Sequence, residues 1–342
     1  MPPSVTAISH GRKRVLRVGV VGIGHLGTRH AQIYAAMPGV RLTAVCDIDA
    51  SRAKTLAKAL DCQAVTDVRA LIGAVDAVSL AVPSTLHGSL GQLLLAHGIH
   101  LLIEKPIATT LAQADALIRT AARRKLVLQI GHVERFNTAI HAAIERLTHP
   151  RFIEVHRLSP YPFRHSTSSG RAGVPSIVEA RGTDVSVVLD VMIHDLDLIL
   201  AMVSSPLRRV QAIGVAVLSA SEDIANARLE FASGCVANLT ASRISDESLR
   251  RFRVFQEETY LSIDSKAQTV EMAHQSDGTI HRVNLPVNQR PPLQDELAAF
   301  IHSVTAKRAP AVSGADGRAA LSLALRIEKV MRQRKPSIVH SR

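Results

Sequence analysis

An aspartate and a histidine lie four residues apart in LDVMIHDLDL, residues 189–198. On an α-helix this spacing puts Asp190 and His194 on one face, with Asp197 close to it. A carboxylate beside a histidine orients the imidazole and keeps it basic, which suits proton removal from an alcohol. A buried histidine satisfied by Asp190 is the structural alternative. The chain lacks an obvious third ligand set, so we expect no metal here.

A lysine follows a glutamate at the end of an apolar run in IEKPI, residues 103–107. Pro106 ends the run, which puts Lys105 at the carboxyl edge of a predicted sheet, beside a cofactor. Its ammonium could stabilise negative charge on a substrate oxygen. A surface ion pair between Glu104 and Lys105 fits the sequence equally well. Lys105 is a candidate catalytic residue, and both residues are candidate cofactor contacts.

The segment GIGHLG, residues 22–27, fits the pattern G-x-G-x-x-G between an apolar run and a helical pattern. Gly22 permits the tight turn, Gly24 lets the backbone approach a pyrophosphate, and Gly27 lets the helix pack on the strand. The helix N-terminus offers free N–H groups to the anion. The turn therefore predicts dinucleotide binding, with candidate contacts at Gly22, Gly24, His25, Leu26 and Gly27.

A carboxylate ends the next apolar run, because Asp47 lies 47 − 27 = 20 positions after Gly27. An acidic residue at this distance binds the adenosine ribose hydroxyls and repels a 2′-phosphate. The sequence therefore favours NAD over NADP, although Arg52 nearby favours the opposite choice.

Two further segments follow predicted strands. In AVPSTLH, residues 81–87, Pro83 forces an extended exit at the sheet edge and His87 starts or lines the next helix. Both are candidate cofactor contacts, and a helix-end histidine is the structural alternative.

The segment GHVERFN, residues 131–137, gathers polar side chains at the predicted domain junction. Arg135 could bind a phosphate or carboxylate through two hydrogen bonds. His132, Arg135 and Asn137 are therefore candidate substrate contacts.

Continuous apolar runs alternate with helical patterns over residues 15–150, which predicts a parallel sheet covered by helices on both faces. The runs are VLRVGVV, RLTAVC, VDAVSLAV, HLLIE and LVLQI. From residue 151 to 342, longer strand patterns predict an α+β domain on a mostly antiparallel sheet. Helices are expected near 185–203, 293–306 and 315–334, and the last two could pack back on the first domain. Residues 1–14 read as a disordered leader, and the loop 163–176 is polar and glycine-rich.

The net charge is +12, from 41 basic and 29 acidic residues, which raises the question of nucleic acid. Aromatic residues make up only 3% and Trp is absent, so base-stacking platforms are poorly supplied. We expect no nucleic-acid partner, and an anionic small substrate would use the same positive field. The three scattered cysteines fit a reducing, cytoplasmic setting, and no apolar run is long enough for a membrane span.

Taken in order, GIGHLG, Asp47, AVPSTLH, EKP and the D-x-x-x-H helix resemble the Gfo/Idh/MocA oxidoreductase family. The resemblance covers about residues 15–335, including the C-terminal helices. It implies a Rossmann domain, an open sheet that forms the substrate face and the oligomer contact, and NAD(P)-dependent oxidation or reduction of a sugar or polyol. Lys105, Asp190 and His194 match the family's catalytic lysine and its aspartate and histidine.

One departure points to a subgroup, because RGTDVSVVLD, residues 181–190, stands where many members carry a glycine cluster. With GHVERFN and MIHDLDL, it resembles members that oxidise UDP-N-acetylglucosamine at the sugar C3. That resemblance implies a 3-keto nucleotide sugar, passed to an aminotransferase for lipid A or surface polysaccharide. His194, oriented by Asp190, would take the hydroxyl proton, Lys105 would steady the carbonyl, and Arg135 would hold the phosphates. The sequence leaves open whether His194 or Lys105 is the formal base.

Two rival functions remain. One is a dehydrogenase of another sugar or polyol, such as inositol, a hexose or a UDP-sugar acid. The other is a dinucleotide sensor without catalysis, which the Lys105, Asp190 and His194 set argues against. An open sheet often buries its outer face against another subunit, so we expect a homodimer or homotetramer.

Overall fold

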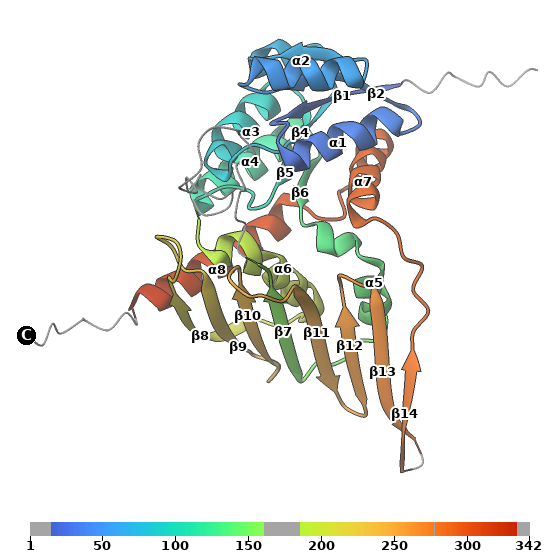
Figure 1. Cartoon of the computed structure of the whole chain (residues 1–342), viewed down its shortest axis with the longest axis vertical. Helices are drawn as coiled ribbons and strands as arrows, with labels where there is room; N and C mark the ends of the chain where they lie inside the picture. Colours follow the sequence, from blue (N-terminus) through green and yellow to red (C-terminus); the bar gives the residue numbers. More distant parts are fainter. Residues whose placement is uncertain (1–14, 161–184, 277, 334–342) are drawn as a thin grey trace, which may run out of the picture.

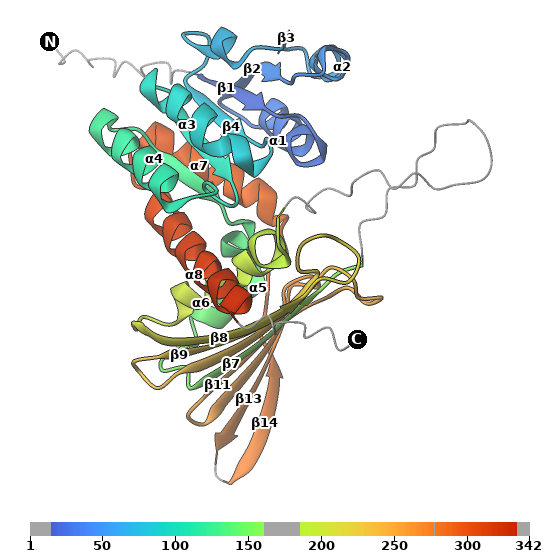
Figure 2. The same cartoon turned by 90° about the vertical axis from the view of Figure 1, so that its left-hand side faces the viewer.

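Two β-sheets lie one above the other in the computed structural model, which describes residues 15–160, 185–276 and 278–333. The upper sheet is parallel and the lower sheet is mostly antiparallel (Figure 1). Helices α5, α6 and α8 lie between the two sheets (Figure 2). The predicted leader at 1–14 and the loop at 163–176 lie outside the described residues.

The upper sheet has the strand order β3-β2-β1-β4-β5-β6, and every pairing in it is parallel. Its strand order reverses between β1 and β4, the place where doubly wound sheets bind ligands. All four residues of β4 and of β6 are buried, as expected for strands covered on both faces. The predicted Rossmann sheet is confirmed, with β1 Leu16–Val21, β2 Val40–Cys46, β3 Gln63–Val65, β4 Ala77–Leu80, β5 His100–Glu104 and β6 Leu128–Gly131.

Helices cover both faces of this sheet. Apolar residues of α1 and α2 pack on one face, and those of α3 and α4 on the other. Asp49 caps α2 by accepting hydrogen bonds from the backbone of Ser51 and Arg52, which fixes the start of the helix after β2. The helices of this half are α1 His25–Ala36, α2 Ala50–Ala59, α3 His87–Ala96 and α4 Leu111–Arg124, with short turns at η1 Val68–Leu71 and η2 Ser84–Leu86. The short turn η3 Val133–Phe136 follows β6, and α5 Thr138–Ile144 packs on β12 and β13 of the lower sheet (Figure 1).

The lower sheet has the order β14-β13-β12-β11-β7-β10-β9-β8. Only β7 and β10 pair in parallel, so the predicted, mostly antiparallel sheet is confirmed. The strands are β7 Phe152–Leu158, β8 Leu207–Val215, β9 Ile224–Phe231, β10 Val236–Ser242, β11 Leu249–Gln256, β12 Thr259–Asp264, β13 Thr269–Ser276 and β14 Thr279–Asn284. The sequence did not indicate β14, because all six of its residues are exposed and carry no burial alternation.

The helix predicted near 185–203 begins with an irregular turn. Residues Val188–Met192 form a π-helix, η4, which continues into α6, Ile193–Met202. Because a π-helix bonds i to i+5, it rotates the side chains that precede it relative to those that follow. This turn determines which way Asp190 and His194 point.

The last two helices return to the upper half. Helix α7, Pro292–Ala306, inserts Leu297 and Phe300 into the apolar cluster formed by β1 and α1. Helix α8, Gly314–Gln333, packs on α4, α6 and β8. Helix α8 therefore joins the two halves, whereas α7 packs against the upper half (Figure 2).

The three cysteines are all unpaired, in agreement with the absence of a disulfide framework in the sequence. Within the described ranges, no helix combines the length and apolar character that a bilayer crossing requires.

Candidate active site

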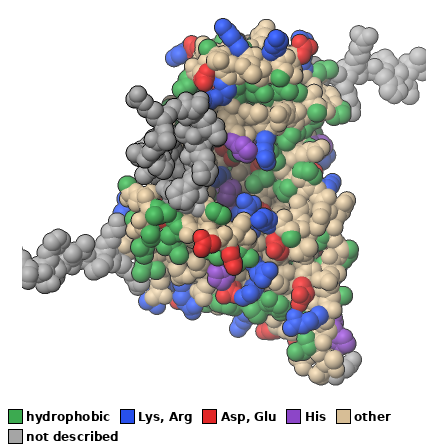
Figure 3. Space-filling model, viewed as in Figure 1, with side chains coloured by type: hydrophobic (Ala, Val, Ile, Leu, Met, Phe, Trp, Pro, Cys, Tyr) green, Lys and Arg blue, Asp and Glu red, His purple; other side chains and the backbone are tan. Residues whose placement is uncertain are grey.

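A cleft of about 450 Å³ lies between the two halves of the molecule. Leu26 and Lys105 line it from the upper half, and His194 and Arg250 from the lower half. The space-filling view shows histidine and basic side chains gathered in the hollow between the halves (Figure 3). Of the residues that the sequence marked for chemistry, Leu26, Glu104, Lys105, Asn137 and His194 therefore converge on one cavity.

The glycine turn leaves no room for side chains. Gly22 has φ +80°, and a Cβ on it would lie 2.6 Å from the carbonyl oxygen of Ala81. A Cβ on Gly27 would lie 1.8 Å from the carbonyl oxygen of Gly22, far inside contact distance. Among the described residues, no side chain caps the N-terminus of α1 at Gly24, so its N–H groups are available to an anion. This turn fits the dinucleotide pyrophosphate that the sequence predicted.

Asp47 lies beside this turn, 7% exposed. Its carboxylate accepts hydrogen bonds from the backbone N–H of Ile23 at 3.0 Å and of Asp49 at 2.9 Å. Arg52 forms an ion pair with it at 3.3 Å. Asp47 therefore fixes the conformation of the turn and remains at the end of β2, where a residue that binds the ribose is expected. The Arg52 guanidinium is already paired with this carboxylate.

Lys105 follows the end of β5 and reaches across to the lower half. Its Nζ donates to the backbone oxygen of Asp190 and, at 2.9 Å, to the Asp190 carboxylate. The two side chains are 18% and 30% exposed, so the ion pair lies at the edge of the cleft. The sequence alternative, an ion pair between neighbours Glu104 and Lys105, is not what forms.

The prediction that Asp190 orients His194 is wrong in this structure. The four-residue spacing assumed a regular α-helix, whereas η4 is a π-helix and Asp190 pairs with Lys105 instead. Among the described residues, His194 Nδ1 is buried and has no hydrogen-bond partner. Burial lowers the pKa of His194 well below its usual value, and the charges of Lys105 and Arg157 lower it further. Burial and these cations therefore favour the neutral imidazole of His194.

His132 lies next to His194, with the rings edge to face and their centroids 6.2 Å apart. It is 1% exposed, and burial lowers its pKa. Neither ring nitrogen has a partner in the part of the chain that the structure describes. His132 thus packs against the ring of His194 and does not line the cleft.

Arg135 does not take the predicted phosphate-binding role. Its guanidinium donates two hydrogen bonds to the buried Asp197 carboxylate, from Nε to Oδ2 at 2.6 Å and from Nη2 to Oδ1 at 3.0 Å. Asn137 lines the cleft, but its amide donates to the backbone oxygen of Ser265 at 2.8 Å. Both side chains mainly join the two halves of the molecule.

His87 begins α3 and is 1% exposed. Its Nδ1 lies 2.7 Å from the oxygen of Pro106, and its Nε2 lies 3.0 Å from that of Val82. Burial lowers its pKa, so the neutral ring donates to only one of these two oxygens. His87 holds the loops after β4 and β5 together, and this geometry does not support its predicted cofactor contact. Pro83 remains exposed at the sheet edge.

Three cations that line the cleft were missing from the sequence prediction. Arg29 comes from α1, Arg250 from β11, and Lys266 from the turn after β12. Arg29 was within reach of sequence reasoning, because it lies two residues after Gly27. Arg250 and Lys266 carry no local signal, since only the strand order of the lower sheet brings them to the cleft.

A buried ion-pair network supports the lower wall. Arg157 on β7 bonds the Asp195 carboxylate at 2.8 Å and Glu134 at 2.9 Å. Arg250 also lies 3.4 Å from Glu134. The network fixes the start of α6, and with it the position of His194.

Two family models match the chain. Residues 16–132 match the NAD-binding Rossmann domain of the Gfo/Idh/MocA oxidoreductase family, and residues 145–262 match its C-terminal domain. Together they span more than half of the sequence, on both sides of the cleft.

Individual relatives show the same pattern. UDP-N-acetylglucosamine 3-dehydrogenase from Acidithiobacillus ferrooxidans is 36% identical over 91% of this chain and 96% of its own. Its solved structure has a TM-score of 0.83 and covers 93% of this chain and 98% of its own. Myo-inositol 2-dehydrogenase from Thermotoga maritima is 25% identical over 94% of this chain and 97% of its own. The chain therefore belongs to the Gfo/Idh/MocA oxidoreductase family and is an NAD-dependent dehydrogenase.

Proposed function

We propose that this dehydrogenase oxidises the C3 hydroxyl of UDP-N-acetylglucosamine to a 3-keto nucleotide sugar. The similarity to the Acidithiobacillus enzyme supports this substrate, since it covers both halves of the chain. Substrate specificity changes readily on a shared fold, so the cleft itself must also fit the substrate.

The observation that carries the proposal is the composition of the cleft. Lys105 and His194, from different halves, face a cavity that three cations line: Arg29, Arg250 and Lys266. A diphosphate carries the negative charge that guanidinium and ammonium groups bind. An uncharged polyol such as inositol has no negative charge for these cations to balance.

The residues present can carry out an alcohol oxidation. NAD bound at the glycine turn supplies a hydride acceptor. His194, neutral because of its burial and its cationic neighbours, accepts the C3 hydroxyl proton. Lys105, charged and anchored by Asp190, donates a hydrogen bond to the same oxygen as it becomes a carbonyl. The C3–H bond breaks with its electron pair leaving as hydride, and the C–O bond becomes double.

The test is NADH formation by the purified protein with NAD and UDP-N-acetylglucosamine, in the presence of an aminotransferase and glutamate that remove the ketone. Free N-acetylglucosamine, UDP-N-acetylglucosaminuronic acid and myo-inositol serve as comparison substrates. We expect turnover with the first sugar only. Turnover with inositol alone would overturn the substrate assignment, and tight NADH binding without any turnover would favour a sensor.

The cations provide a sharper test of the same cleft. Replacing Arg250 or Lys266 by Met should raise KM for UDP-N-acetylglucosamine about tenfold or more, since a charged hydrogen bond contributes about 1.5–3 kcal/mol. The dissociation constant of NAD should not change. Arg282→Met is the matched control, because Arg282 is exposed on β14 and pairs only with Glu271 among the described residues. An unchanged KM in both cleft variants would contradict the proposed diphosphate contact.

The proposal extends to partners. An aminotransferase would consume the 3-keto product, and the resulting 3-amino sugar would serve lipid A or a surface polysaccharide. We also propose a homodimer or homotetramer through the open sheet. In support, Ile213 and Val215 on β8 are 60% and 49% exposed, on the side away from Gly214, which faces α8. Sedimentation measurements test this, and a monomer at micromolar concentration would contradict it.

A further inference from the structure

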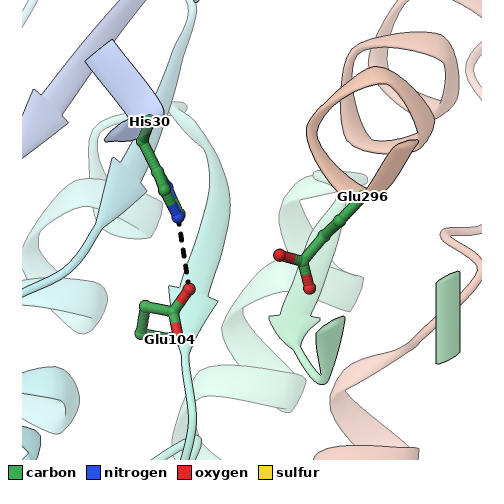
Figure 4. A group of neighbouring side chains, drawn as sticks. All are labelled: His30, Glu104 and Glu296. Atoms are coloured by element: carbon green, nitrogen blue, oxygen red, sulfur yellow. Dashed lines mark ion pairs between the residues drawn. The ribbon is translucent and has the colours of Figure 1, made fainter. Parts of the chain in front are cut away.

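Three titratable side chains meet at the back of the cleft, where only Glu104 reaches its lining, and nothing in the proposed reaction uses all of them. His30 comes from α1, Glu104 from the end of β5, and Glu296 from α7 (Figure 4). One ligand atom from each lies within 4.8 Å of the other two. Their exposed fractions are 0%, 8% and 0%, so this buried triad is almost closed to solvent.

The triad is short of hydrogen-bond partners. Within the described residues, both ring nitrogens of His30 and both carboxylate oxygens of Glu296 are buried without a hydrogen bond. The contact within the triad is the pair of His30 Nε2 and Glu104 Oε1, which are 3.4 Å apart. Groups this buried are normally paired, so the triad needs either a bound cation or a change of protonation.

Among the described residues, no lysine or arginine pairs with Glu296. Facing it are His30 and Tyr34 from α1, Glu104 from β5, and Gln129 from β6. Tyr34 is bonded to Ser79, and the Gln129 amide donates to the backbone oxygen of Glu296 rather than to its carboxylate. Two carboxylates at this separation in a dry site cannot both stay ionised without a counter-charge.

We propose that the triad is a proton-holding cluster, in which Glu296 stays a neutral carboxylic acid at neutral pH and Glu104 carries the single negative charge. Burial and the charge of Glu104 raise the pKa of Glu296 well above its usual value, in line with this assignment. His30 faces the ionised Glu104 on one side, and the neutral Glu296 faces it on the other.

The cluster acts on the active site through the backbone. Glu104 Oε2 accepts a hydrogen bond from the backbone N–H of Lys105 at 3.3 Å. Its carboxylate also packs on Gly131, where a Cβ would lie 2.8 Å from Glu104 Oε1. Glu104 is thus a positioning residue for Lys105. Because Glu296 is neutral, it adds no second negative charge near Lys105. This consequence rests on the proposed role of Lys105, whereas the protonation state does not.

The protonation state predicts a distinct pH dependence of stability. Glu296 is neutral in the folded chain, whereas in the unfolded chain it ionises above 4.5, the ordinary pKa of a glutamate side chain. Its contribution to stability is therefore complete below that value and declines as pH rises toward the folded-state pKa. Relative to a variant without this carboxyl group, the folding equilibrium of the wild type should weaken by up to about tenfold per pH unit.

The experiment compares thermal unfolding of the wild-type chain with Glu296→Gln and Glu296→Met from pH 5 to 8, with a metal chelator present. We expect both variants to gain melting temperature relative to wild type as pH rises, because neither can ionise. Glu296→Gln should also keep kcat within a few-fold of wild type, since the amide is neutral and nearly the same size as the protonated carboxyl group. A difference in melting temperature that does not change with pH would overturn the proposal.

Two further measurements test the proposal if the variants do not fold, and test whether the triad binds a metal ion instead. If the variants fail to fold, infrared spectra of the wild type at neutral pH must still show the carbonyl stretch of a buried protonated carboxyl group, and its absence would overturn the proposal. Metal analysis of the purified wild type tests the cation alternative. One equivalent of zinc per chain, lost in Glu296→Gln together with stability at pH 8, would establish a metal site instead. None of these readouts depends on the sugar substrate.

Discussion

The cleft has two walls that hold their polar groups by different means. The dinucleotide wall contains the glycine turn, residues 22–27, and the sheet wall is formed by the lower sheet and the start of α6. On the dinucleotide wall, backbone N–H groups are placed by glycines whose neighbours leave no room for a Cβ, such as Gly27 against Gly22. On the sheet wall, side chains are placed by paired charges, such as Arg157 between Asp195 and Glu134. The first wall is vulnerable to one added carbon, and the second to one removed partner.

Lys105 and Asp190 join the two walls, and the largest effect is expected there. Lys105→Met and His194→Ala should each lower kcat about 10³-fold, within the range for lost proton transfer and charge stabilisation. The dissociation constant of NADH, measured by fluorescence, should stay within a few-fold. Near-wild-type turnover in either variant would show that its assigned role is wrong.

The sheet wall should fail by loss of charge. Arg157→Met leaves Asp195 buried without its partner and Glu134 with only the more distant Arg250 as a counter-charge, which should cost about 3–5 kcal/mol of unfolding free energy. Arg282→Met, which removes an exposed ion pair, should cost less than about 1 kcal/mol. Urea unfolding of both variants measures the difference, and equal losses would contradict the proposed importance of the buried network.

The dinucleotide wall should fail by steric conflict. Gly27→Ala should weaken NADH binding about 100-fold, or about 3 kcal/mol, because α1 must move off the turn. Gly39→Ala is the control, since Gly39 lies shortly after the end of α1, has φ +77° and has nothing within 4 Å of a Cβ. It should cost about 1 kcal/mol of stability through its backbone conformation and leave NADH binding intact. Equal losses of binding would remove the steric explanation.

The smallest effect concerns pH. Burial and neighbouring cations lower the pKa of His194 well below 6.5, so the neutral form persists as the pH falls. The acid limb of kcat/KM should therefore lie below pH 6.5, and replacing Arg250 by Met should move it upward, because that cation contributes to the shift. An acid limb above pH 6.5 in the wild type would mean that His194 is not the base.

Local sequence encoded the dinucleotide wall well, for a physical reason. Glycine spacing specifies backbone conformations within a few residues, so Gly22 and Gly27 could be assigned their roles before the fold was known. Lys105 was predictable too, because Pro106 marks where β5 ends. The missing β14 illustrates the limit, since an exposed edge strand leaves no pattern.

The sheet wall was harder to predict because its partners are distant in sequence. Arg135 pairs with Asp197, 62 residues away, and so is lost to the substrate. In the π-helix at 188–192, Asp190 pairs with Lys105 instead of His194, and no residue type in that segment predicts a π-helix. Charge pairing and helix irregularity depend on tertiary packing, which spacing rules do not include.

The most direct test of the central claim uses UDP-N-acetylglucosamine that carries deuterium at C3. If the C3–H bond delivers its hydride across the cleft, the deuterium must appear in the NADH formed, and Lys105→Met must slow that transfer. Deuterium that stays in the sugar while NADH forms would contradict oxidation at C3 and the arrangement of the site proposed for it.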